Sequence, residues 1–211
     1  MKMKRLIHIA LVGIWVALAS AGTDATTGRV RFVIDGDTII LADGRTVRYI
    51  GIDAPEIDHD DQRAQPFAYE ARRFNEKLVG GSPVRLEFDR ERRDRYGRIL
   101  AHIFTADGRL VTEAILASGF AHVFPKKPNL KYGERLLSGQ RTAMERGVGK
   151  WQNGQGAGEA YIGNRNSRRF HRPDCPFAQR ITGKNRVSFT SRYTAFYAGY
   201  APCRACLGAG W

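Results

Sequence analysis

The sequence predicts an α+β protein in which a small β-barrel carries helices on its surface and a second, smaller module follows it. Five short stretches with alternating polar and apolar residues indicate half-buried strands. Three amphipathic stretches, each ended by glycine, indicate short helices. A Gly-rich polar stretch then precedes a C-terminal part that holds all three cysteines. Short strands interleaved with a few helices are typical of small barrels.

The composition is that of a folded, basic protein. The chain has 211 residues, of which 43% are hydrophobic, so a packed core can form and wholesale disorder is excluded. We expect a barrel domain at 28–151, a linker at 152–160 and a small module at 161–211. The formal net charge of +13 indicates a polyanionic partner, either nucleic acid or an anionic membrane surface. Much of this charge lies in the last module, which has nine Lys or Arg and one acidic residue.

The N-terminal segment, residues 1–21, has the pattern of a secretory signal peptide. Three basic residues precede an apolar run at 6–19, and Ala19-Ser20-Ala21 offers a cleavage site. A membrane anchor is the alternative, but a run of 14 residues is short against the ~20 needed to cross a bilayer. We therefore expect a secreted or periplasmic monomer that is not attached to a membrane after cleavage.

The first strands form a hairpin. Arg29–Val33 alternates polar and apolar residues, Thr38–Leu41 follows, and Asp43-Gly44 provides a turn before Thr46–Ile50. A turn centred on Asp43-Gly44 pairs positions whose numbers sum to about 87, which would place Asp37 opposite Ile50.

The remaining elements alternate between helix and strand. Pro66 opens a helix whose Phe67, Ala71, Phe74 and Leu78 share one face, and Gly80-Gly81 closes it. The other predicted elements are strands at Val84–Phe88 and Leu100–Phe104 and helices at Thr112–Ser118 and Glu134–Arg146.

Two carboxylates lie on the arms of the first hairpin. Folding brings Asp37 and Asp53 to the same edge, where they repel each other unless a hard cation joins them. Oxygen ligands favour Ca²⁺ or Mg²⁺ over zinc. Arg48 lies on the same arm of the hairpin as Asp53, and Glu56 follows on a stiff turn after Pro55.

Three ordered motifs resemble the staphylococcal nuclease (thermonuclease) family. They are Val33–Thr38, Arg48 with Asp53–Glu56, and Asp94–Arg98, and the resemblance extends from Gly28 to Trp151. It implies a five-stranded OB-fold barrel with three helices. It also implies a Ca²⁺-dependent phosphodiesterase that hydrolyses DNA and RNA to 3′-phosphorylated products.

The implied reaction gives roles to three side chains. Hydrolysis of a phosphodiester needs a carboxylate that deprotonates water, and Glu56 suits that role. Guanidinium groups stabilise the charge that grows on the phosphoryl oxygens, and Arg48 and Arg98 are the candidates.

The resemblance assigns further roles. The carboxylates of Asp37 and Asp53 and the carbonyl of Ala54 would bind Ca²⁺, while Arg95 and Tyr96 would contact substrate phosphates. The family type has threonine in place of Ala54, which is harmless where only a carbonyl is used. It also has a pair of tyrosines where this chain has Phe124–Pro128, so base stacking is expected to differ.

These residues also allow other interpretations. The aspartates could serve turns alone, with Arg48 and Glu56 forming a surface ion pair. The barrel could bind nucleic acid without cutting it, since OB-folds often do. The protein could also use its basic module to stay near the anionic cell envelope.

The cysteines have zinc-ligand spacing. His171 and Cys175 form an H-x3-C motif, and Cys203 and Cys206 form C-x2-C after a gap of 27 residues. A module with few large apolar clusters needs such a staple. The segment resembles the metal-binding module of the Ada alkylphosphotriester-repair protein, with His171 where that module has its methyl-accepting cysteine. The resemblance therefore implies the fold, structural zinc and DNA contact, but not alkyl transfer. A Cys203–Cys206 disulfide and a basic face without a partner are the alternatives.

Overall fold

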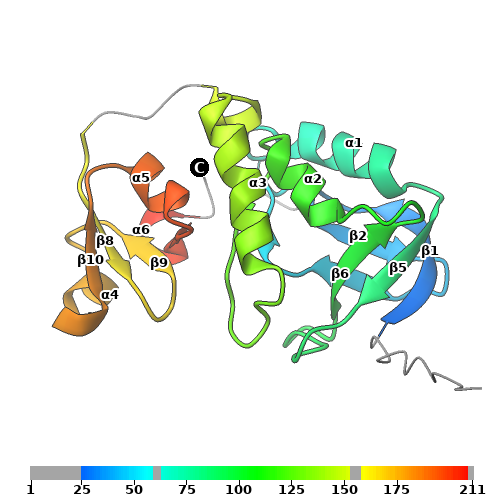
Figure 1. Ribbon diagram of the computed structural model, residues 1–211, viewed down its shortest axis with the longest axis horizontal. Coiled ribbons are helices and arrows are strands. Elements are labelled where there is room, and N and C mark those ends of the chain that lie inside the picture. The colour runs from blue at the N-terminus through cyan, green and yellow to red at the C-terminus, as the bar shows by residue number, and fades with distance from the viewer. Residues whose placement is uncertain (1–24, 59–62, 153–157, 209–211) are drawn as a thin grey trace, which may run out of the picture.

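The computed structural model describes residues 25–58, 63–152 and 158–208 in two parts that lie on either side of helix α3 (Figure 1). The N-terminal part is a closed five-stranded barrel in the order β1-β2-β3-β6-β5. Only the β3–β6 pair is parallel among these neighbours. The strands are β1 (Ala25–Val33), β2 (Thr38–Leu41), β3 (Thr46–Tyr49), β5 (Pro83–Glu87) and β6 (Ile99–Thr105). This confirms the predicted fold class.

The first hairpin forms as predicted, but its register is shifted by one residue. Thr38 pairs with Arg48, so paired numbers sum to 86, and the Tyr49 N–H donates to the Asp37 carbonyl at 2.8 Å. The reason is the length of the loop. The Leu41 N–H donates to the Arg45 carbonyl, which leaves a three-residue loop with Gly44 at φ 85° instead of a two-residue turn.

Three helices cover the barrel: α1 (Ala68–Val79), α2 (Val111–Ala117) and α3 (Gly133–Glu145). All three were predicted, but the buried face of α1 differs. Asn75 is fully buried, while Phe74 and Leu78 are only partly buried. Asn75 accepts from the Tyr49 hydroxyl at 3.0 Å and donates to the Asp35 carbonyl at 3.0 Å. The sequence pattern predicts that Phe74 points into the core. Asn75 takes that place because it forms hydrogen bonds with buried polar groups.

A short two-stranded ribbon extends the barrel towards the C-terminal part. It consists of β4 (Ile52–Asp53) and β7 (His122–Val123), which are antiparallel. A 3₁₀ turn at Gly149–Trp151 follows α3. The ribbon places Asp53 beside the C-terminal part of the chain.

The C-terminal part is a four-stranded sheet in the order β10-β8-β9-β11 with short helices around it. Its strands are β8 (Tyr161–Asn164), β9 (Arg169–His171), β10 (Arg186–Phe189) and β11 (Ala201–Pro202). Its helices are α4 (Pro176–Gln179), α5 (Arg192–Tyr197) and α6 (Arg204–Leu207). We call these elements, residues 161–208, the C-terminal module.

The C-terminal module contains more apolar packing than its sequence suggests. Phe170 and Phe196 lie edge to face with centroids 5.1 Å apart, and Trp151 meets Phe196 at 5.2 Å. Ala143 and Met144 of α3 belong to the same buried cluster. The expectation of few large apolar clusters in this module is therefore wrong, because the module shares a core with α3.

Helix α3 is two-sided. Leu136 and Leu137 pack into the barrel core, whereas Ala143 and Met144 face the C-terminal module. Between them, the buried Gln140 accepts from the Val123 N–H at 2.7 Å and donates to the Phe196 carbonyl at 2.6 Å. This side chain ties both parts to one helix.

Two of the sequence predictions fall outside this description. The predicted signal peptide at 1–21 lies outside the described residues, as does 153–157 of the predicted linker. None of the helices in the described ranges has both the length and the apolar character needed to span a bilayer.

Glu87 provides a test of how the barrel is held to the segment before α3. Burial alone would raise its pKa, but hydrogen bonds from Lys131, Tyr132 and Arg85 outweigh burial and lower the pKa to about 2. A lowered carboxyl pKa stabilises the fold above the ordinary pKa, and the stabilisation disappears as the pH falls through the folded pKa.

We therefore expect Glu87→Gln to lower the free energy of unfolding near neutral pH by about 3 kcal/mol, an upper value from the pKa difference. Urea unfolding should show the difference from wild type shrinking between about pH 4.5 and pH 2. The exposed Glu70→Gln is the control, with an expected change of less than about 0.5 kcal/mol. A difference that does not vary with pH would contradict this account.

Candidate active site

Three aspartates converge where the β1–β2 loop meets the end of β4. Asp35, Asp37 and Asp53 are all buried. Gly36 makes this approach close, because a Cβ at this position would lie 2.6 Å from the Ala54 Cβ and 2.8 Å from the Ala71 Cβ. The motif thus needs glycine for space, not for an unusual φ.

Backbone N–H groups hold the carboxylates in place. Asp37 accepts from the Ala54 N–H at 2.7 Å and from the Thr38 hydroxyl at 3.0 Å. Asp35 accepts from the Asp37 N–H at 2.8 Å. Asp35 belongs to the predicted motif but was given no role of its own. Here it shapes the loop that presents Asp37.

Arg48 joins the two carboxylates that were predicted to share a cation. Its Nη1 lies 2.9 Å from Asp37 Oδ2, and its Nη2 lies 2.8 Å from Asp53 Oδ1. Its Nη1 also donates to the Tyr49 and Ile52 carbonyls. Burial raises the pKa of Asp37, and the neighbouring Asp35 and Asp53 raise it further, while Arg48 opposes both. The site therefore concentrates negative charge that one guanidinium partly neutralises.

Glu56 lies at the half-buried edge of this cluster. Its N–H donates to Gln65 Oε1 at 3.1 Å. Burial raises the pKa of its carboxyl, and the negative charge of Asp37 raises it further. A carboxylate with a raised pKa is a better proton acceptor near neutral pH than an ordinary glutamate.

The predicted 94–98 motif forms a tight turn just before β6. Asp94 accepts from the Tyr96 and Arg98 N–H groups and from Arg98 Nε at 2.7 Å. Leu100 of β6 pairs with Arg48 of β3 in parallel register, and Arg98 comes just before β6. Tyr96 is 68% exposed, with the Arg95 guanidinium 4.8 Å from its ring. No hydrogen bond between described residues joins Arg95, Tyr96 or Arg98 to the carboxylate cluster.

Sequence reasoning missed one residue at the cluster, Arg204. Its Nη2 lies 3.0 Å from Asp53 Oδ1 and 3.1 Å from Oδ2, across 151 positions of sequence. The only signal in the sequence is its place between Cys203 and Cys206 in a basic segment. Such a position gives no hint of a partner in the barrel.

The aromatic ring of Phe124 lies under the same module. The Arg169 guanidinium lies 3.8 Å from its centroid, and Arg204 lies 5.8 Å away. Arg169 Nη1 also donates to the Pro125 carbonyl at 3.2 Å. The segment expected to differ from the family in base stacking is thus covered by arginines.

The predicted zinc ligands come together. The ligand atoms of His171, Cys175, Cys203 and Cys206 all lie within 4.8 Å of one another, and all but Cys206 are buried. His171 Nδ1 is 3.6 Å from Cys175 Sγ. Cys175 precedes α4 and Cys203 precedes α6, so two helix starts and the end of β9 supply the set. The three cysteines carry no disulfide bond.

This donor set fits zinc. Ligand atoms about 2.1 to 2.3 Å from a tetrahedral zinc ion lie about 3.5 to 3.8 Å apart, so the set needs only a slight contraction. Burial and the charge of Arg169 lower the pKa of His171, which favours the neutral imidazole that binds metal. Burial and the adjacent Cys175 and Cys203 raise the pKa of Cys206 to about 12. A cation among these sulfur atoms would stabilise the Cys206 thiolate and so lower the pKa of this thiol.

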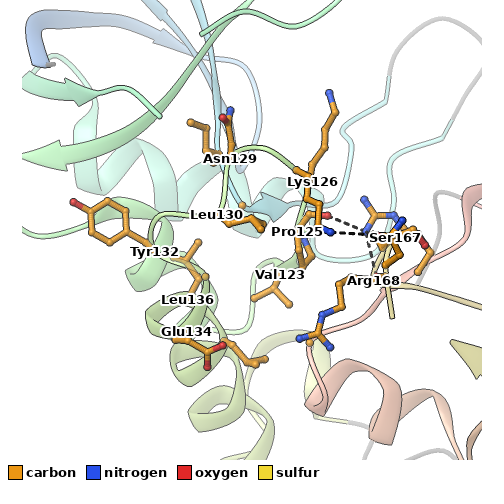
Figure 2. A pocket seen from close by; sticks show the side chains of 18 of the residues that line it. Val123, Pro125, Lys126, Asn129, Leu130, Tyr132, Glu134, Leu136, Ser167 and Arg168 are labelled. Atoms are coloured by element: carbon orange, nitrogen blue, oxygen red, sulfur yellow. Dashed lines mark hydrogen bonds between the residues drawn. The ribbon is translucent and has the colours of Figure 1, made fainter. Parts of the chain in front are cut away.

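A separate cavity of about 560 Å³ lies between the two parts of the chain (Figure 2). Ser167 and Arg168 of the C-terminal module face Val123 and Pro125 across it, and Leu136 of α3 forms part of its apolar wall. None of the three aspartates lines it. Its basic residues are Lys126, Lys127, Arg165, Arg168 and Arg169.

Comparisons with known proteins match the barrel. The model of the family described as staphylococcal nuclease homologue matches residues 46–153. A thermonuclease of Staphylococcus hyicus is 37% identical over 130 residues, which are 60% of this chain and 76% of that protein. Endonuclease YncB of Bacillus subtilis is 36% identical over 137 residues, which are 63% of this chain and 62% of that protein. The C-terminal module lies outside the matched family model.

The Cys/His cluster generates a prediction. The purified chain should hold one zinc ion, and Cys206→Ser should weaken zinc binding by more than about 100-fold, because losing a ligand costs more than losing an outer partner. Plasma mass spectrometry and competition with a chromogenic chelator measure both quantities. Ser188→Ala, exposed in the same module, is the control. A metal-free chain with only one titratable thiol would contradict zinc binding and favour the disulfide.

Proposed function

The chain belongs to the staphylococcal nuclease homologue family, and from this premise we propose that it is a calcium-dependent nuclease. Its substrates are the phosphodiesters of DNA and RNA. The observation that carries the proposal is the buried meeting of Asp37 and Asp53, with Arg48 between them and Glu56 at their edge. A merely structural turn would not need converging carboxylates that repel one another.

The carboxylate cluster suits a calcium ion. Asp37, Asp53 and the Ala54 carbonyl offer only oxygen donors, which Ca²⁺ prefers, and water completes such shells. The charge between Asp35, Asp37 and Asp53 is only partly offset by Arg48, so a divalent cation would stabilise the cluster. When bound, Ca²⁺ supplies positive charge that polarises the phosphoryl group.

Different side chains carry out different parts of the hydrolysis. Glu56 accepts a proton from the attacking water, whose oxygen bonds to phosphorus as the bond from phosphorus to O5′ breaks. The leaving O5′ takes up a proton, and the other product ends in a 3′-phosphate. Arg48 and Arg98 donate to the phosphoryl oxygens, which become more negative as phosphorus becomes five-coordinate. Arg95 and Tyr96, exposed on the 94–98 turn, contact phosphates of the strand.

The rest of the chain serves this activity. Zinc on His171, Cys175, Cys203 and Cys206 stabilises the C-terminal module, whose positive charge favours nucleic acid. The protein acts outside the cytoplasm, secreted or periplasmic, after removal of residues 1–21, and works as a monomer. The charged N-terminus and the short apolar run support export.

The nuclease is tested by incubating the purified chain with single-stranded and duplex DNA and RNA, in Ca²⁺ or in chelator. We expect Ca²⁺-dependent fragments that end in 3′-phosphate. Glu56→Gln should lower the cleavage rate by ~10²–10⁴-fold, the usual contribution of a positioned base. Gel electrophoresis and phosphatase sensitivity of the ends measure the products.

The exposed Glu70→Gln, on α1, provides the matched control and should cleave like wild type. Substrate that is bound yet stays intact in every metal condition would overturn the catalytic proposal and indicate a non-catalytic binding barrel. Cleavage that Glu56→Gln leaves unchanged would remove the assigned role of Glu56.

A further inference from the structure

A half-exposed arginine from outside the barrel lies at the carboxylate cluster. Arg204 reaches Asp53 through Nη2 alone, and its side chain is 57% exposed against 13% for Asp53. Its hydrogen bonds to described residues leave Nη1 and Nε unused. Arg204 also acts on Glu56, lowering its pKa against the larger effect of burial. One edge of this guanidinium therefore faces the cluster, and the other faces solvent.

The fold, and not chance side-chain geometry, sets this position. Arg204 follows Cys203 directly and begins the short helix α6, which also contains Cys206 of the proposed metal site. The Cys203 N–H donates to the Phe170 carbonyl at 2.9 Å, which ties the start of α6 to β9. The shared core with α3 then fixes the module against the barrel. These packed elements hold the backbone of Arg204 in place, while its exposed side chain can turn.

A second arginine points to the same edge. Arg169 lies over Phe124. Burial lowers its pKa to about 10, while the charge of Asp53 raises it and the charge of Arg204 lowers it. Arg169 thus keeps its charge near neutral pH. The two arginines and the Phe124 ring form a basic, aromatic border on the side of Asp53 that the C-terminal module covers.

The charge count at the cluster shows what Arg204 adds. The carboxylates of Asp35, Asp37, Asp53 and Glu56 with Arg48 carry a formal charge of −3, which Arg204 reduces to −2. A divalent cation would then bring the cluster to neutrality, whereas without Arg204 it would stay negative. A phosphodiester anion would be repelled by a negative cluster and not by a neutral one.

We propose that Arg204 binds a substrate phosphate, so that the C-terminal module completes the nucleic-acid site of the barrel. The inference rests on the proposed nuclease function and assigns that site a residue outside the matched family segment. The Arg204 guanidinium is more than half exposed, and Asp53 keeps its ion pair with Arg48 when Arg204 turns to a phosphate. The planar guanidinium can then hold two phosphate oxygens.

The arrangement also links this contact to the metal cluster. Cys203 and Cys206 flank Arg204, so loss of the metal ligands would displace the guanidinium as well as loosen the module. Cys206→Ser should therefore weaken substrate binding in the same way as Arg204→Ala, without changing any group in the barrel.

The test compares Arg204→Ala, Arg204→Lys and the control Arg109→Ala. Arg109 is a matched arginine, because it is 64% exposed and pairs with Asp107 at 2.8 Å on another turn of the barrel. Cleavage kinetics are measured in Ca²⁺. Binding of a short fluorescent oligothymidylate is measured in the Glu56→Gln background over a range of salt concentrations, and Ca²⁺ affinity is measured by calorimetry.

For Arg204→Ala we expect KM and the oligonucleotide Kd to rise about tenfold, with kcat changed much less, and the salt slope of binding to fall by about 1. Arg204→Lys should recover part of the affinity, and Arg109→Ala should match wild type. Equal losses in both alanine variants would overturn the proposal, because they would reflect net charge alone. Tighter Ca²⁺ binding and faster cleavage by Arg204→Ala would also overturn it, since Arg204 would then block the site.

The two proposals fail in distinguishable ways. If the wild-type chain cleaves nothing, the nuclease proposal fails. The difference in oligonucleotide binding between Arg204→Ala and Arg109→Ala still decides whether Arg204 contacts phosphate. If the chain cleaves but that difference is absent, only the Arg204 proposal fails.

Discussion

The burial of three aspartates within one loop and one ribbon is the constraint on which much of this structure depends. Removing carboxylates from water is costly unless each finds donors and opposite charge. Arg48 provides the charge. The register of the hairpin places Arg48 opposite Thr38, within reach of both Asp37 and Asp53. Gly36 provides the space for the loop to approach β4. The local turn length, the register and the choice of glycine are all consistent with one electrostatic requirement.

Helix α3 extends this constraint to the rest of the chain. The helix lies between the barrel and the C-terminal module (Figure 1). Its apolar residues belong to two buried clusters, one in the barrel and one shared with the module. Gln140, fully buried, has both ends of its amide bonded, one to each part. A buried amide that lost either partner would be strongly destabilising, which favours a single docking geometry. That geometry is what brings a guanidinium from the C-terminal module to Asp53.

The sequence was sufficient for the strands and helices of the barrel and for the Cys/His set, because each leaves a local signal in periodicity, terminating glycines or spacing. It did not predict the strands and helices of the C-terminal module or the β4–β7 ribbon. It was insufficient where a side-chain position or a strand register depends on contacts between segments that are distant in sequence. The inward position of Asn75 depends on the Tyr49 hydroxyl and the Asp35 carbonyl, neither of which is near it in sequence. The hairpin register depended on whether Ala42 joins the loop, which the Asp-Gly signal alone does not decide. The position of Arg204 between two cysteines does not indicate a partner in the barrel.

The two clusters proposed to bind metals lie close together in the structure but differ in chemistry. A single peptide bond joins Cys203 of the sulfur cluster to Arg204, which contacts Asp53 of the oxygen cluster. Thiolates and imidazole select zinc, whereas carboxylate and carbonyl oxygens select calcium, so neither ion competes well for the other cluster. The softer cluster can therefore stay loaded while the harder one exchanges its ion with solvent. A zinc ion that stays bound would then hold the Arg204 backbone in place. A calcium ion that exchanges with solvent would be able to bind and leave together with the substrate.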